Sequence, residues 1–107
     1  MKNWDSADEI LRQCAPEVTG LLKLMANEQR LQLLCQMRDQ EVSVGDLAER
    51  TGQPQSGVSQ NLARLRERAL VATRRDARTI YYRIADPKVS ALMEFLCDTF
   101  AKGRQSA

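Results

Sequence analysis

Hydrophobic residues recur at helical spacing over most of this chain and alternate at strand spacing in one short stretch. The first helical stretch, residues 6–25, contains Pro16, which we expect to end or kink the helix. A second helix, residues 28–39, follows Asn27, a residue suited to capping a helix N-terminus. Its apolar stripe includes Cys35, so we expect that cysteine to face the interior.

A strongly amphipathic helix is predicted near the end of the chain, over residues 86–102. Asp86 and Pro87 form an N-cap and first-turn pair, and Gly103 is expected to close the helix before a frayed tail. The apolar positions that follow the cap share one face of the helix: Val89, Leu92, Met93, Leu96 and Phe100.

The central segment combines both kinds of spacing. Residues 43–50 and 56–68 read as two helices around a tight turn, a helix-turn-helix over about 43–68. Residues 71–84 alternate like a two-stranded ribbon with its tip at Asp76 and Ala77. The predicted fold class is therefore mainly α with one β-hairpin, a winged helix-turn-helix of order α-α-α-α-β-β-α, and residues 1–107 form a single domain.

The second helix of the motif has the pattern of a DNA recognition helix. Val58, Leu62 and Leu65 would bury one side, leaving the other side for base edges in the major groove. Glutamine can pair with adenine, arginine with guanine or phosphate, and serine can donate or accept. The residues expected on that exposed side are Gln55, Ser56, Ser59, Gln60 and Arg64. For Ser56, simple capping of the helix is the competing interpretation.

The hairpin adds positive charge beside that helix. Arg74, Arg75 and Arg78 surround its tip and are expected to contact phosphates or enter a minor groove. Ile80, Tyr82 and Ile84 occupy alternate positions of the second strand of the hairpin. We expect these three side chains to pack on the core and the side chains between them to face outward.

Charge is divided unevenly along the chain. Residues 50–83 contain eight Arg and only Glu67 and Asp76 as acids, which gives +6 and leaves −4 for the rest of a chain of net charge +2. A local basic face of this kind suits phosphate contact. Two competing interpretations are a solvated helix face and a winged helix that binds protein, and salt-dependent binding to duplex DNA would separate them from the DNA-binding one.

Composition argues against several other classes of protein. No stretch approaches the roughly 20 apolar residues of a membrane span, and the N-terminus lacks the form of a secretory signal, so we expect a cytoplasmic protein. The three cysteines have no CxxC spacing and are expected to be free thiols. Histidine is absent, and no phosphate-binding glycine loop is present, so an enzyme is not expected.

Four segments resemble the ArsR/SmtB family of bacterial winged-helix repressors: LxLLCxM with Cys35, SVGDLAERTG, SQxxxxLRERALV, and TRRDARTIYYRI. The resemblance runs from about Leu21 to Phe100. It implies a homodimer formed by the N- and C-terminal helices, about 6–25 and 86–102, bound to a palindromic operator in double-stranded DNA.

The metal sites of that family are missing their ligands in this sequence. Where arsenic and cadmium sensors carry cysteines, this chain has Ser43 and Gly45. At the zinc-sensing positions of the terminal helix Asp86 remains, but the other three places are taken by Lys88, Thr99 and Lys102. We therefore expect no metal and no cofactor.

The resemblance points instead to the sulfide- and redox-responsive branch of the family, in which reactive sulfur species link two thiols and the dimer releases its operator. Cys35 matches the first thiol, with Arg38 one turn on expected to ease its ionisation. Cys97 would be the second thiol, although the family pattern places it one helical turn later, at Ala101.

The sequence thus predicts a repressor whose operator affinity depends on the thiol state of Cys35 and Cys97, with reactive sulfur or an oxidant as inducer. Two alternatives stay open. Both cysteines could be small buried hydrophobes in a repressor with no thiol sensing, or Cys14 could join them in a three-thiolate arsenite site.

Overall fold

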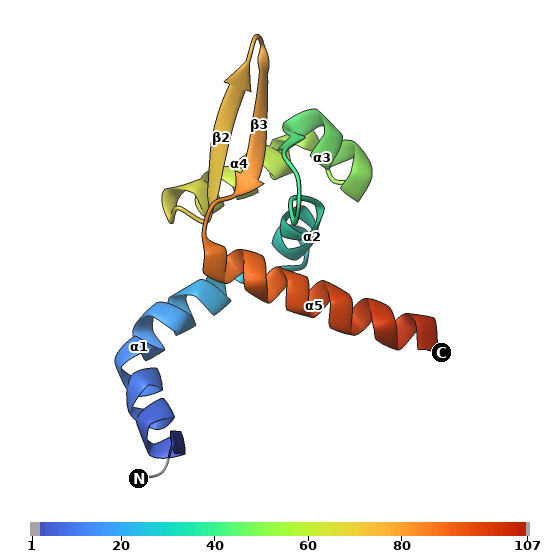
Figure 1. The fold of residues 1–107 in the computed structure, drawn as a ribbon. Coiled ribbons are helices and arrows are strands. Elements are labelled where there is room, and N and C mark those ends of the chain that lie inside the picture. The colour runs from blue at the N-terminus through green and yellow to red at the C-terminus, as the bar shows by residue number, and fades with distance from the viewer. Residues whose placement is uncertain (1–2, 107) are drawn as a thin grey trace.

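The computed structural model describes the backbone of residues 3–106 and the side chains of residues 6–103. The elements in chain order are α1 (Asn3–Met25), α2 (Glu28–Gln36), β1 (Val42–Ser43), α3 (Val44–Thr51), α4 (Gln55–Glu67), β2 (Val71–Asp76), β3 (Thr79–Ile84) and α5 (Pro87–Ser106). Figure 1 shows α2, α3 and α4 beside a projecting β-hairpin, with α1 and α5 leaving the body in different directions. The predicted winged helix is confirmed, with one additional short strand.

Of the two outcomes predicted at Pro16, an end or a kink of the helix, the structure excludes the end. The helix α1 continues through Pro16 to Met25, and its ribbon curves along its length (Figure 1). Proline removes one backbone donor and pushes the preceding turn aside, which a long helix can accommodate by bending. The next helix, α2, is capped by Asn27 as predicted, through a 3.0 Å hydrogen bond from Arg30 N, but it ends at Gln36, not at Asp39.

The helix-turn-helix is built from two differently capped helices. Ser43 caps α3 by accepting a hydrogen bond from Asp46 N at 3.2 Å. Gly52 ends α3 in the left-handed conformation, with φ of 71°, which glycine adopts without steric cost. The second helix, α4, starts after Pro54, so Ser56 lies inside its first turn and does not cap it. The capping interpretation of Ser56 is therefore wrong.

The wing is part of a three-stranded antiparallel sheet of order β1-β3-β2, where two strands were predicted. The short strand β1 pairs Val42 with Tyr82 and so connects the wing to the start of α3. The β2–β3 turn consists of Ala77 and Arg78, one residue later than predicted, with Ala77 at φ of 58°. Tyr82 packs against the core, but Ile80 is exposed because it lies beyond the body of the domain.

The core fills the space between α2, α3, α4, the base of the wing and the first turns of α5. Its fully buried side chains include the predicted stripe of α4, which consists of Val58, Leu62 and Leu65. From the other elements, the fully buried side chains include Leu33, Leu34, Met37, Leu47 and Val89. The base of the wing is closed by a 2.8 Å hydrogen bond from Ala85 N to Leu70 O.

The last helix, α5, begins as predicted, with Asp86 accepting a hydrogen bond from Lys88 N at 2.9 Å. It does not close at Gly103 but continues to Ser106. Its first half is anchored by Val89 and Met93, whereas Phe100 is 70% exposed. Within the described part of the chain, none of the helices combines the length and the apolar character that crossing a membrane requires.

Candidate DNA interface and cysteine pair

The exposed side of α4 carries every residue predicted for base contact. Three leucine and valine side chains of this helix, Val58, Leu62 and Leu65, are fully buried, which fixes the rotation of the helix about its axis. All five predicted polar residues are exposed as a consequence: Gln55, Ser56, Ser59, Gln60 and Arg64. The polar side of the helix is therefore free to enter a major groove, since none of the residues that the structure describes covers it.

A polar contact that sequence patterns did not reveal holds this helix in place. Arg30 on α2 donates to Asn61 Oδ1 on α4 at 3.0 Å and to Leu24 O near the end of α1, also at 3.0 Å. The guanidinium thus joins α4 to α2 and to the end of α1. Arginine and asparagine are common on exposed helix faces, so nothing in the sequence marked these two as partners.

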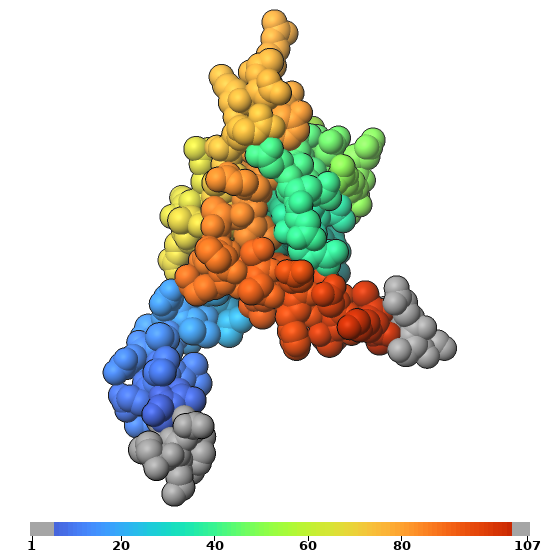
Figure 2. Space-filling model, viewed as in Figure 1, coloured from blue at the N-terminus to red at the C-terminus, as the bar shows by residue number. Residues whose placement is uncertain are grey.

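The three arginines predicted around the tip of the wing are placed differently. Arg74 is held by Glu41 at 2.9 Å and lies over the ring of Tyr81 at 5.0 Å. Arg75 and Arg78 are exposed and form no ion pair among the described side chains. Arg78 is in the turn at the tip, where the hairpin projects farthest from the body (Figures 1 and 2). Near its tip the wing therefore presents two cations without an ion pair among the described side chains and one that a carboxylate already binds.

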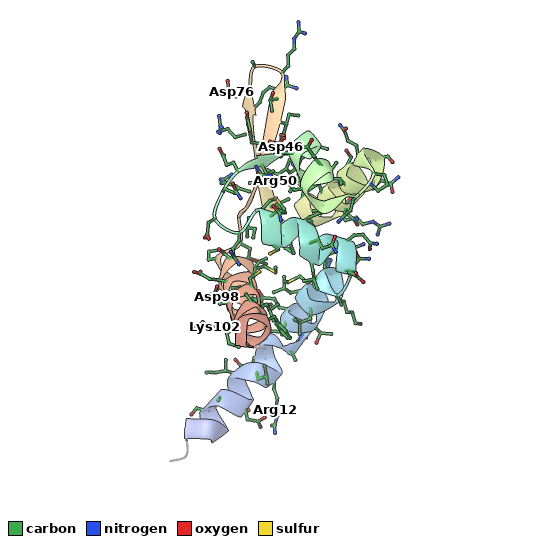
Figure 3. The ribbon with its side chains drawn as sticks, turned by 90° about the vertical axis from the view of Figure 1, so that its right-hand side faces the viewer. Arg12, Asp46, Arg50, Asp76, Asp98 and Lys102 are labelled. Carbon is green, nitrogen blue, oxygen red and sulfur yellow. The ribbon has the colours of Figure 1, made fainter. Side chains whose placement is uncertain are left out.

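The two cysteines of the predicted sensing pair lie against each other. The Sγ atoms of Cys35, on α2, and Cys97, on α5, are 3.0 Å apart. Both side chains are half-buried and both sulfurs belong to free thiols. Ala101, the position that the family pattern favours for the second cysteine, is exposed. Cys97 on the preceding turn is thus the cysteine that faces Cys35, and the two helices lie side by side in Figure 3.

The surroundings of Cys35 make its thiol harder to ionise, whereas the sequence predicted easier ionisation. Burial raises the pKa of the Cys35 thiol above its ordinary value, and the hydrogen bond and charge of Cys97 raise it further. The positive charge of Arg38 lowers the same pKa, but less than the other causes raise it. The expectation that Arg38 eases ionisation of Cys35 is therefore wrong in its net sign. Arg38 lies directly beside the pair, with Arg38 N donating to Cys35 O at 3.2 Å, and the nearby Cys97 raises the pKa of Arg38.

The third cysteine lies elsewhere. Cys14 lines a separate cavity of about 320 Å³ between α1 and the start of α5, together with Pro16, Arg68 and Lys88. Among the described side chains, no three Cys, Asp, Glu or His residues gather as a metal ion requires. The three-thiolate arsenite site is thus not formed within one chain. Asp86, the residue retained from the family's zinc site, is bound to Lys88, 3.2 Å away, and the hydrogen bond from the backbone of Lys88 lowers the pKa of Asp86.

Apolar side chains remain uncovered on the two arms of the molecule. On α1, Ile10 and Leu11 are 60% and 58% exposed, and on α5 Phe95 is 63% exposed. Figure 2 shows that both arms extend beyond the body of the domain. Figure 3 marks Arg12 on α1, and Asp98 and Lys102 on α5, as polar side chains of the same arms. These apolar side chains of the two arms are therefore left uncovered by the other residues that the structure describes.

The chain is similar in sequence to known bacterial regulatory proteins. Residues 27–73 match the family model described as "Bacterial regulatory protein, arsR family". The chain is 46% identical over 85 residues to the transcriptional activator HlyU of Vibrio cholerae, covering 79% of each sequence. It is 36% identical over 99 residues to the biofilm growth-associated repressor of Xylella fastidiosa, covering 92% of this chain and 87% of that protein.

The fold is also shared with a solved structure. The structure of reduced HlyU from Vibrio cholerae superimposes with a TM-score of 0.81 at 41% sequence identity. The match covers 86% of this chain and 97% of that one.

Proposed function

Because this chain belongs to the arsR family of bacterial regulatory proteins, whose matched members are DNA-binding transcriptional regulators and not enzymes, we propose that it is a repressor controlled by Cys35 and Cys97. In the reduced state it binds a palindromic operator as a homodimer in the cytoplasm. Linking the two thiols releases the operator. The 3.0 Å separation of the two sulfurs is the observation that carries the proposal.

The DNA-binding mode follows from the exposed side of α4 and the tip of the wing. Gln55, Ser59 and Gln60 are on the exposed side of α4 and supply donors and acceptors for base edges. Arg64 and Arg78 supply charge for phosphates. A two-fold dimer presents two such helices, so we expect half-sites about one helical turn apart, roughly 34–36 Å centre to centre.

The thiol step needs an oxidant, and a persulfide supplies it. The thiolate of one cysteine attacks the outer sulfur of a persulfide RS–SH, so that the S–S bond breaks, RS⁻ leaves and a cysteine persulfide forms. The second cysteine then attacks the inner, cysteine-bound sulfur and expels HS⁻ as a disulfide forms. The balance is one RSSH and two thiols giving one disulfide, RSH and H₂S. Attack on a second persulfide before closure would leave extra sulfur in the bridge.

The positions of the two cysteines connect this chemistry to DNA binding. Cys35 is on α2, which packs on α3 and α4, whereas Cys97 is on α5, the arm proposed to form the dimer. A disulfide requires an S–S length near 2.05 Å, so the sulfurs must approach each other by about 1 Å. The bond fixes α5 relative to the helix-turn-helix formed by α3 and α4. It thereby changes the spacing of the two recognition helices in the dimer. Typical coupling free energies of about 1–3 kcal/mol correspond to a roughly 5- to 150-fold loss of affinity.

Mass spectrometry after treatment with glutathione persulfide tests the chemistry. We expect a Cys35–Cys97 crosslink, with or without added sulfur, that dithiothreitol removes. The matched control is Cys14→Ser, which leaves the pair intact and should crosslink as the wild-type protein does. Independent, unlinked modification of the two cysteines would contradict the proposal and would favour a repressor without thiol sensing.

A further inference from the structure

An open groove lies next to the cysteine pair and is lined by two arginines. The groove has a volume of about 260 Å³ and is formed by the segment after α2 and by the end of β3. Its lining residues are Met37, Arg38, Asp39, Gln40, Glu41, Arg83 and Ile84. Arg38 N donates a hydrogen bond to Cys35 O at 3.2 Å, so the segment that forms one wall of the groove begins directly beside the cysteine pair.

The charges of the groove do not cancel among themselves. Glu41 is already bound by Arg74, which donates to both carboxylate oxygens from outside the groove at 2.9 and 3.1 Å. Asp39 approaches Arg38 Nε only at 3.6 Å, and its side chain is 76% exposed. Arg83 forms no ion pair among the described side chains. With Glu41 neutralised by Arg74, two guanidinium groups face one solvated carboxylate.

We propose that this groove is the docking site for a low-molecular-weight persulfide that carries carboxylates, with Arg38 and Arg83 binding its carboxylate groups. The inference rests on the proposed function and adds the class of inducer. Planar guanidinium groups bind carboxylates in paired hydrogen bonds, whereas a lysine in the same place would supply only a point charge.

Docking places the reactive end of the ligand at the sulfurs. With its carboxylates on Arg38 and Arg83, the outer sulfur of RS–SH is delivered toward the Cys35–Cys97 pair. The covalent step is the one given above: RS⁻ leaves with the binding groups, and HS⁻ leaves when the second thiol closes the disulfide. Neutral oxidants such as hydrogen peroxide gain nothing from the groove, because they have no group for it to bind.

The test compares two persulfides of opposite charge. Glutathione persulfide carries two carboxylates, whereas cysteamine persulfide carries an amine and no carboxylate. The rate of crosslinking is followed by mass spectrometry against the concentration of each reagent, for the wild-type protein and for Arg83→Gln. Arg83→Gln is chosen because Arg83 is exposed and has no hydrogen bond to either sulfur. Arg75→Gln, on the exposed part of the wing, is the matched control.

We expect Arg83→Gln to raise the half-saturating concentration of glutathione persulfide about fivefold, with the limiting rate unchanged. Arg75→Gln should leave it unchanged, and cysteamine persulfide should react equally well with both variants. Equal behaviour of Arg83→Gln and Arg75→Gln toward glutathione persulfide would overturn the docking site. Absence of a crosslink in the wild-type protein with either reagent would instead overturn the proposed function, so the two failures are distinguishable.

Discussion

At the scale of single residues, side chains of the same type have different roles because their neighbours differ. Arg74 is bound to Glu41 and Tyr81, while Arg78, four residues on, is exposed at the tip of the wing. An arginine that must first break its ion pair with a carboxylate contributes less binding free energy at a phosphate than an arginine without such a pair. Residue type alone therefore overstates the contribution of Arg74 to DNA binding.

We predict that Arg78→Ala weakens binding to all duplex sequences alike and lowers the magnitude of the slope of log K against log salt by about 1 per protomer, or about 2 for the dimer. Arg74→Ala should change the slope less, because Glu41 loses its partner in the same step. The measurement is fluorescence anisotropy over a salt series. Arg12→Ala, on the arm that lies away from the wing, is the control. A slope unchanged by Arg78→Ala would exclude a phosphate contact at the tip.

The reactivity of Cys35 should depend on pH in a direction set by its surroundings. Because the pKa of Cys35 is raised above 9.0, its alkylation by iodoacetamide should still be accelerating as pH rises through 9.0. In Cys97→Ala two of the causes that raise this pKa are gone, so the inflection should move to lower pH. Stability follows the same sign: the neutral thiol is favoured in the folded state, so stability declines as pH rises through the folded pKa.

Rates of alkylation at Cys35, measured by mass spectrometry from pH 7 to 10, check this prediction. An inflection below 9.0 in the wild-type protein, or one that Cys97→Ala moves upward, would contradict the environment described for the pair.

At the scale of elements, the spacing of residues within one helix predicted the features that depend on that helix alone. The buried stripe of α4 and the cap at Asn27 follow from spacing within one helix, and the structure has both. The strand β1 was missed because its two residues gain their partners from β3, some forty positions away. The same limit applies to the cysteine pair: helical spacing places Cys35 and Cys97 on their helices, but the packing of α2 against α5 decides that they meet.

The orientation of α4 should depend on the bridge that Arg30 makes. We predict that Arg30→Met, which keeps most of the aliphatic stem, lowers stability by about 1–3 kcal/mol, because Asn61 and the Leu24 carbonyl lose a charged donor. Operator affinity should fall as well, since the recognition helix loses a fixed contact to α2. Urea unfolding at constant protein concentration and anisotropy measure the two effects.

Arg66→Met is the matched control for that substitution, because Arg66 is an exposed arginine of α4 itself. Equal stability of the two variants would show that the Arg30 bridge contributes nothing measurable.

At the scale of the whole molecule, the two arms account for the proposed homodimer. Exposed apolar side chains at Ile10, Leu11 and Phe95 are costly in a monomer and stabilising when a second copy covers them. We predict that Phe95→Glu shifts the protein toward monomer by light scattering and weakens operator binding. Ile80→Glu, on the exposed wing, should leave the dimer intact. A dimer unaffected by Phe95→Glu would exclude this part of α5 from the interface.

The central claim is that the bond between Cys35 and Cys97 controls DNA affinity. Its most direct test uses a duplex selected by the reduced protein from a random library, with affinity measured by anisotropy before and after glutathione persulfide treatment. We predict a roughly 5- to 150-fold loss that dithiothreitol reverses and that Cys97→Ala abolishes. Unchanged affinity in a sample whose Cys35–Cys97 crosslink is verified by mass spectrometry would contradict the account.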